Sequence, residues 1–142
     1  MSTNGWDKLL CKYFYQVCEK VLFEYFSAHN FIPEENTIGG VIFKKKDIFF
    51  EVSYIPESFP NYSISMVIGL GTGSYDDHGR FFGVPLWRIV SENSVESTIF
   101  SQTFSNEEEL YKLLVAAKET VVEKYAKPLW QKPDALKKEL AK

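Results

Sequence analysis

The spacing of apolar residues changes along this chain, and that change constrains the fold more than any other feature. From Asp7 to His29 the apolar residues recur at steps of three and four, which places them on one face of a helix. Asn4 or Asp7 could cap the start of this helix, and Asn30 tolerates the left-handed conformation in which helices often end. The predicted apolar face consists of Leu9, Leu10, Tyr13, Phe14, Val17, Val21, Leu22, Tyr25 and Phe26.

From Thr37 the period is two, which is the spacing of a strand with one buried face. Strands are predicted within Thr37–Lys44, which contains a Gly-Gly bend before its apolar residues, and over Asp47–Tyr54. A short charged turn joins the two into a hairpin. A third strand is predicted over Tyr62–Leu70. Pro56 and Pro60 bracket the connecting loop, because proline cannot donate a hydrogen bond within a central strand.

The second half begins with Gly69–Gly83, a long segment without a period, and loops of this length are usually functional or mobile. Val84–Val90 and Val95–Phe104 are then predicted to form a second hairpin. A short helix over Pro85–Asn93 is the alternative for the first of these two strands, because Pro85 near its start suits a helix as well as an edge strand.

A second long helix is predicted to begin at Ser105, whose hydroxyl would cap the helix while Glu108 reaches back to it. This helix is expected to end before Pro128, and the apolar pair that follows, Leu129 and Trp130, would anchor the chain. The last segment, residues 133–142, is predicted to be a short helix or a frayed tail.

The predicted order is therefore one helix, five strands and one helix. Strands that follow one another through short connections pair in antiparallel fashion, and both helices need the same apolar face of the sheet. The sequence thus predicts an α+β fold, in which an antiparallel sheet of about five strands is packed on one face by an N-terminal and a C-terminal helix. No repeat or linker interrupts the chain, so residues 1–142 are expected to form a single domain.

Composition excludes several classes of protein. The chain has 142 residues, is 45% hydrophobic and carries a net charge of −3, which is unlike a disordered chain. No apolar run is long enough for a secretory signal or a membrane span, so no membrane association is expected. In one helix, Cys11 and Cys18 would lie about 10.5 Å apart, beyond the roughly 7 Å limit for a disulfide. Free thiols predict a reducing, cytoplasmic compartment.

The candidates for catalysis are few. The glycines at 69, 71 and 73 are not followed by the lysine or the helix that a phosphate-binding loop requires. Asp76, Asp77 and His78 form the only compact titratable cluster, and a metal site would need a further remote ligand. No nucleophile is paired with a base at a recognisable spacing. We therefore expect no enzyme and no cofactor; a small-ligand or metal-dependent enzyme that uses His78 is an alternative.

One basic and aromatic segment raises the question of nucleic-acid binding. Lys44, Lys45 and Lys46 are flanked by phenylalanines, and such patches can bind single strands. Three lysines at a hairpin turn are more often a device that keeps a sheet edge soluble, and the net acidic charge opposes a polyanion. No nucleic-acid partner is expected.

The aromatic content is high, with 3 Trp, 8 Tyr and 12 Phe residues, or 16% of the chain. Two helices and one sheet face would absorb only part of these rings, and aromatic residues are enriched at the centres of protein interfaces. The remaining rings would either seal the open sheet face or form a contact surface. Those placed in or beside loops and strand ends include Phe59, Tyr62, Tyr75, Phe81, Phe82, Trp87 and Trp130.

The first half also has a hydrophobic pattern in which a helix and a phenylalanine-bearing turn lead into three strands. The segments that carry it are His29-Asn30-Phe31-Ile32, Val41-Ile42-Phe43, Phe49-Phe50-Glu51-Val52, Tyr62-Ser63-Ile64-Ser65 and Ile68-Gly69-Leu70. Over residues 9–70 this pattern resembles the small bacterial α+β domains of the DUF4304 type, some of which resemble immunity proteins of toxin systems. The resemblance implies a bacterial binding protein and brings no catalytic signature.

A second resemblance concerns architecture. Small acidic type III secretion chaperones also place helices on an antiparallel sheet, and they form dimers. They have a helix between the third and fourth strands, where this chain has its glycine-rich loop unless residues 85–93 are helical. A chaperone-like homodimer that serves a secreted effector is therefore an alternative.

The leading prediction is a non-enzymatic cytosolic protein-binding domain, an immunity-like inhibitor that occludes a partner such as a toxin or effector. Asp76 and Asp77 would offer charge to a basic target. The predicted binding surface comprises Tyr75, Asp76, Asp77, His78, Arg80, Phe81, Phe82 and Trp87.

Overall fold

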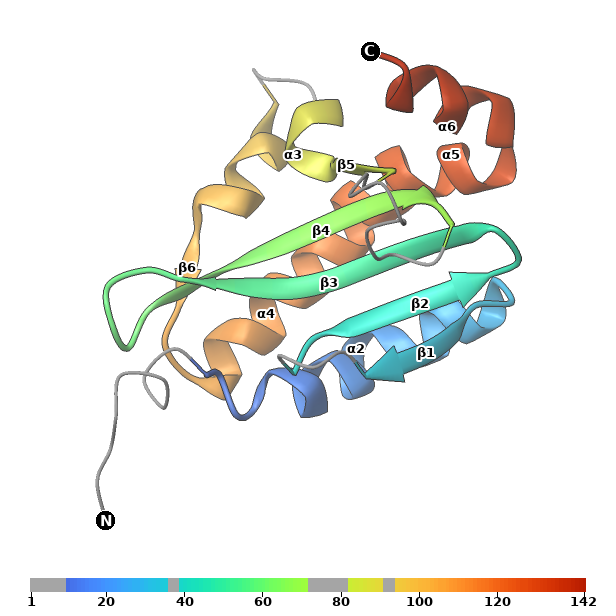
Figure 1. The fold of residues 1–142 in the computed structure, drawn as a ribbon. Coiled ribbons are helices and arrows are strands. Elements are labelled where there is room, and N and C mark those ends of the chain that lie inside the picture. Colours follow the sequence, from blue (N-terminus) through green and yellow to red (C-terminus); the bar gives the residue numbers. More distant parts are fainter. Residues whose placement is uncertain (1–9, 36–38, 72–81, 91–93) are drawn as a thin grey trace.

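One sheet with helices on one of its faces makes up the fold (Figure 1). The structure is a computed structural model of residues 1–142, and it describes residues 10–35, 39–71, 82–90 and 94–142. Six antiparallel strands form the sheet in these segments, in the order β1-β2-β3-β4-β5, and β6 pairs with β4. The predicted α+β class, with an antiparallel sheet and flanking helices, is confirmed.

The first described helix, α2 (Phe14–Ala28), buries most of the predicted apolar stripe in the core. Leu10 was also assigned to the stripe, but it precedes the helix and is 42% exposed. The predicted cap residues Asn4 and Asp7 lie outside the described residues. Within them, the helix begins at Phe14, and the hydroxyl of Tyr62 donates to the carbonyl of Leu10 at 3.3 Å. Asn30 has φ +69°, which confirms the left-handed residue predicted after the helix.

The predicted hairpin is present as β2 (Val41–Lys45) and β3 (Ile48–Pro56), and it continues into β4 (Tyr62–Leu70). Lys46 makes the turn with φ +53°. Strand β1 (Ile32–Glu35), which pairs with β2, was not predicted. Its four residues include a proline and show no alternation of buried and exposed side chains, so the period-two signal is missing.

The predicted strand Val84–Val90 is wrong beyond Pro85. Here β5 (Gly83–Pro85) is followed by the short helix α3 (Leu86–Ile89), which agrees with the alternative helical prediction. β5 pairs with the far end of β4, where Ile68 faces Val84.

The predicted strand Val95–Phe104 is also wrong over most of its length. It contains the 3-10 helix η1 (Val95–Ser101), and only β6 (Thr103–Phe104) is extended. The hydroxyls of Ser97, Thr98 and Ser101 each donate to the carbonyl three residues earlier. These local side-chain bonds compete with strand pairing and favour the tight helical turns.

The second long helix begins at α4 (Glu107–Ala117), but Asn106 caps it rather than Ser105. The Asn106 side chain accepts from the Glu109 N–H at 2.9 Å, and Glu109 accepts from the Ser105 N–H at 2.7 Å. The predicted capping bond is thus shifted by one residue to Asn106, while the returning glutamate, Glu109, still bonds Ser105.

The helix does not end before Pro128, which corrects the prediction. It continues as the π-helix η2 (Lys118–Ala126) and then as α5 (Lys127–Gln131). Proline lacks the N–H of a normal α-helical turn, and the wider π turns before Pro128 let the chain remain helical. The last segment forms α6 (Pro133–Leu140), the helical one of the two predicted alternatives.

Aromatic rings fill the core between the sheet and the helices. The rings of Phe26 and Phe43 stack with centroids 4.2 Å apart, and Trp130 packs edge-on against Phe31 at 5.1 Å. Trp130 and Tyr62 are 3% and 5% exposed, so these two rings belong to the core and not to a contact surface, although Tyr62 begins β4 as expected of a strand end. Trp130 is buried because the helix continues through Pro128 and places the indole against the rings of Phe26, Phe31 and Phe50.

The sheet has two unlike faces. The inner face carries the core residues of β3 and β4, including Phe50, Val52, Met66 and Ile68, and the helices α2 and α4 lie behind it (Figure 1). The alternating residues point to the opposite side, called the outer face below. Helices α2 and α4 do not lie on this face (Figure 1). It is nevertheless partly covered, because Phe49, Ser53 and Ser63 on it are buried. Within the described segments, no helix has the length and apolar character needed to cross a membrane.

Candidate protein-binding surface

Most of the predicted binding surface lies outside the described residues. This applies to Tyr75, Asp76, Asp77, His78, Arg80 and Phe81. Phe82 and Trp87 are described, and both side chains are exposed, by 45% and 63%. They flank the three-residue strand β5, one on each side, so the structure brings these two aromatic residues to the same edge of the sheet.

The backbone of Phe82 is held tightly against β4. Its carbonyl accepts from the Leu70 N–H at 3.0 Å, and a Cβ atom at Gly69 would lie only 2.1 Å from that carbonyl oxygen. Glycine is therefore required at position 69 because the chain passes so close. The exposed Phe82 side chain thus projects from a fixed backbone.

Trp87 also projects from an anchored segment. It lies in α3, where the neighbouring Leu86 is fully buried. On its other side, the Arg88 guanidinium donates to the Glu139 carbonyl of α6 at 3.3 Å. An exposed indole held between two anchored neighbours loses little conformational freedom when a partner covers it.

Glu51 lies in the middle of the outer face and was not among the predicted site residues. It is in register with Ile42 on β2 and with Val67 on β4, and all three side chains are half-buried. Burial between these apolar neighbours raises the pKa of the Glu51 carboxyl above its ordinary value. The alternation of β3 assigned Glu51 to the outer face in advance, but only the register reveals its apolar neighbours.

Small hydroxyl side chains continue the outer face beside Glu51. Ser53 and Ser65 are cross-strand partners, and Ser63 follows further along β4. The Ser63 hydroxyl donates to the Glu57 carboxylate at 2.8 Å. Ser53 and Ser63 are buried, with 9% and 4% of their surface exposed, whereas Ser65 is half-buried.

The three lysines of the β2–β3 hairpin do not act as one patch. Lys44 forms an ion pair of 2.9 Å with Glu34 on β1, whereas the Lys45 ammonium lies 5.8 Å from the centre of the Phe31 ring. Lys46 occupies the turn. The basic and aromatic segment seen in the sequence is therefore divided among three environments.

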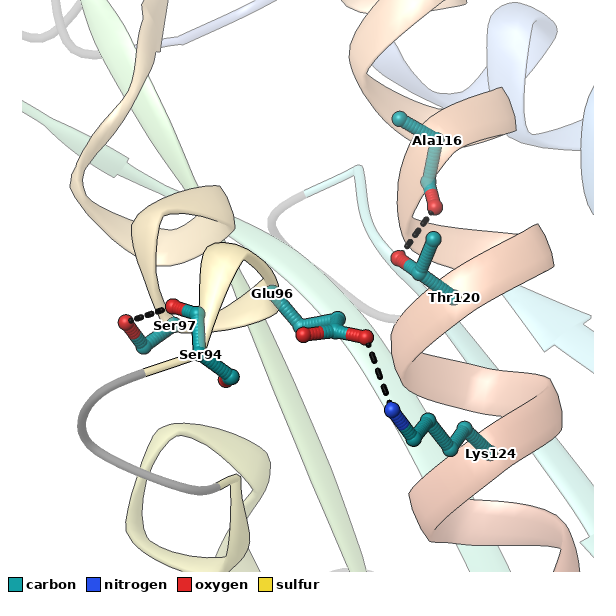
Figure 2. A network of polar contacts seen from close by, with 6 residues as sticks. All are labelled: Ser94, Glu96, Ser97, Ala116, Thr120 and Lys124. Atoms are coloured by element: carbon teal, nitrogen blue, oxygen red, sulfur yellow. Dashed lines mark hydrogen bonds and ion pairs between the residues drawn. The ribbon is translucent and has the colours of Figure 1, made fainter.

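An open cavity of about 280 Å³ lies between η1 and the helix formed by α4 and η2, with Val95, Ile99 and Ala116 in its lining. Figure 2 shows Glu96 of η1 pointing toward Lys124 of η2, and their ion pair measures 3.0 Å. The Glu96 backbone N–H and Lys124 hold the pKa of the Glu96 carboxyl below its usual range. A carboxylate that stays ionised and paired joins the two helices and is poorly suited to proton transfer.

The two cysteines belong to the core. Cys11 and Cys18 are free and buried, and burial raises the pKa of the Cys11 thiol to about 11. Thiols of this kind are inert as nucleophiles. In the part of the chain that the structure describes, no group of three or more His, Cys, Asp or Glu side chains could hold a metal ion.

The described surface therefore combines two anchored aromatic residues at the β5 edge with an outer face that has a carboxylate at its centre. Comparison with known proteins adds no further guide to its role. No family model, no curated protein and no solved structure matches this chain.

Proposed function

We propose that this chain is a non-enzymatic, cytosolic protein-binding domain that inhibits a partner by covering it, in the manner of an immunity protein. The partner would be a toxin or an effector. The observation that carries the proposal is the pair Phe82 and Trp87, two exposed aromatic side chains on anchored backbone at one edge of the sheet. Large rings on a rigid scaffold are typical binding hot spots.

The energetics favour this use of the two residues. Burying apolar surface contributes roughly 25 cal/mol per Å², and an aromatic side chain has about 150–250 Å². Because neither backbone segment needs to be ordered on binding, more of this gain appears as affinity. Each ring should therefore contribute on the order of 2 kcal/mol to a complex that buries it.

Site-specific photo-crosslinking tests the proposal. A benzophenone amino acid is placed at position 82 or 87, and at Phe59 or Tyr111 as matched controls, since these are aromatic residues 62% and 49% exposed on other parts of the surface. Irradiation in the cells that encode the chain should give one dominant adduct from positions 82 and 87 only. Equal adducts at all four positions, or none at 82 and 87, would contradict the proposed function.

The mass of the adduct also separates the alternatives. A heterologous adduct fits an occluded toxin or effector, whereas an adduct of twice the chain's mass fits the chaperone-like homodimer. Trp87→Ala should abolish the heterologous adduct formed from position 82, while Tyr111→Ala should leave it unchanged. Sedimentation of the purified chain is the parallel measurement, and a stable dimer would favour the chaperone-like alternative over the inhibitor.

A further inference from the structure

Among the residues that the structure describes, none supplies a counter-charge to the carboxylate of Glu51 on the outer face. Its in-register neighbours, Ile42 and Val67, are apolar. The basic residue that shares this face on the adjacent strand is Lys44, and that ammonium is paired with Glu34 at 2.9 Å. Among the described residues, no donor forms a hydrogen bond or an ion pair with Glu51.

The free energy needed to keep the Glu51 carboxylate ionised increases when a partner covers it and removes water. In the free protein, solvent on the open side still hydrates part of the carboxylate, although burial already raises its pKa. A partner that covered the outer face would remove the remaining water. An uncompensated buried carboxylate costs several kcal/mol, so a partner without a donor at this point would be rejected.

The neighbours of Glu51 indicate what kind of donor fits. Ile42 and Val67 offer apolar walls on both sides, which suit the methylene stem of a long basic side chain. Further along the same face, Ser53 and Ser65 are cross-strand partners, and neither carries a charge that could pair with Glu51. Arginine suits the site best, because its guanidinium is weakly hydrated and can bind a carboxylate through two hydrogen bonds.

We propose that the protein partner places a basic side chain, arginine or lysine, on Glu51, and that this ion pair selects the partner. This inference rests on the proposed function, because it assumes that the outer face next to Phe82 and Trp87 is covered by another protein. It adds the charge and the position of one required residue of that partner. A partner segment with basic and apolar residues in alternation would satisfy both the carboxylate and its apolar walls.

Selection from a random dodecapeptide phage library tests the inference without knowledge of the natural partner. The full chain is immobilised as wild type, as Glu51→Gln and as Glu57→Gln, the last being a matched acidic control at the nearby β3–β4 connection. Wild type and Glu57→Gln should enrich peptides with an arginine or lysine at one fixed position beside apolar residues. Glu51→Gln should lose that preference.

The pairing is then measured on the best synthetic peptide. Replacing its basic residue by glutamine, or replacing Glu51 by glutamine, should each weaken binding at least tenfold. Both changes together should weaken it no more than either one alone, because the two groups act as a pair. Additive losses would overturn the ion pair, and so would a peptide consensus without a basic residue or no enrichment over the bare support.

Two further variants, compared with Glu51→Gln, separate the sources of failure. If Trp87→Ala abolishes peptide binding while Glu51→Gln does not, the proposed function stands and the ion pair is overturned. If neither variant matters, both proposals fail. Arg80→Gln tests whether a cation of this chain already neutralises Glu51: enrichment of basic peptides by Arg80→Gln alone would overturn the assignment to a partner. Circular dichroism confirms that each variant is folded.

Discussion

Gly69 and Phe49 face each other across β4 and β3 so closely that a Cβ atom at Gly69 would lie 2.7 Å from the Phe49 ring. The ring lies on the outer face, yet it is only 1% exposed. Because residue 69 has no side chain, the Phe49 ring can pack over it and the backbone at Phe82 can pass beside it. The Phe82 carbonyl oxygen would lie 2.1 Å from a Cβ atom at residue 69. This contact connects the sheet to the candidate binding surface.

Gly69→Ala should destabilise the protein by about 3 kcal/mol, because overpacking against a backbone carbonyl cannot be relieved by a side-chain rotation. Urea unfolding, followed by circular dichroism, measures the change. Phe49→Ala in the same background should recover only a part of the loss, since the clash with the Phe82 carbonyl remains. Full recovery would mean that the ring alone sets the limit.

Asn106→Ala should cost about 1 kcal/mol of stability, since its side chain accepts from the Glu109 N–H at the start of α4. Ser105→Ala should cost less, because Glu109 keeps its bond to the Ser105 backbone N–H. Thermal unfolding of the two variants at one pH provides the comparison. A larger loss of stability in Ser105→Ala than in Asn106→Ala would mean that Ser105 is the capping residue, as expected from the sequence.

Glu51→Gln should raise the stability of the free protein at pH 7 by up to about 1 kcal/mol, since the change removes a partly desolvated charge. The pKa of Glu51 is raised in the folded state, so the folded protein holds this proton more tightly than the unfolded chain. The cost of the charge therefore appears as pH rises through the raised pKa and disappears below the ordinary value of 4.5. Unfolding curves of wild type and Glu51→Gln should show the variant to be more stable at pH 7 but not at pH 4. An equal increase in stability at both pH values would contradict this prediction.

Glu123 should show the opposite pH dependence. The Tyr25 hydroxyl donates to this carboxylate and Lys127 pairs with it at 2.9 Å, which lowers the pKa of Glu123. Its contribution is present above the ordinary carboxyl pKa and is lost as pH falls through the lowered value. Tyr25→Phe should therefore destabilise the protein at pH 7, by about 0.5–1.5 kcal/mol, and by less in acid. Scans of melting temperature against pH for wild type and variant provide the measurement.

Cys11 and Cys18 should not react with Ellman's reagent at pH 8 in the native protein, because both side chains are buried and burial raises both thiol pKa values. Both should react at once in denaturant. Rapid native labelling of Cys11 would show that the segment before α2 opens readily.

Residues with a strong period were predictable, and residues whose structure depends on remote contacts were not. The alternation from Ile48 to Tyr54 located β3 and assigned each side chain to a face, because burial on one side imposes that pattern. Pro128 predicted the end of a helix. The helix instead continues through it, because the preceding turns are π-helical and Trp130 packs in the core. Local hydroxyl bonds made Val95–Ser101 helical although valine and isoleucine favour strands.

The candidate site shows the same division. Phe82 and Trp87 could be chosen from composition and loop position, and both are exposed. Glu51 could be assigned to a face but not to a role, since its significance depends on Ile42 and Val67 from two other strands and on the engagement of Lys44 by Glu34. Cross-strand neighbours are set by register, which a single sequence does not reveal.

Two short strands, β5 and β6, pair with the edge of β4 that β3 does not occupy. This arrangement affects the order of folding. Strands β1 to β4 pair with their neighbours in sequence, whereas β6 joins Tyr62 to Phe104 across a much longer stretch of chain. Closing the longer loop costs more entropy before any contact compensates for it. The meander of β1 to β4 should thus form in the transition state and β6 should dock after it, so substitutions at Phe104 should mainly accelerate unfolding.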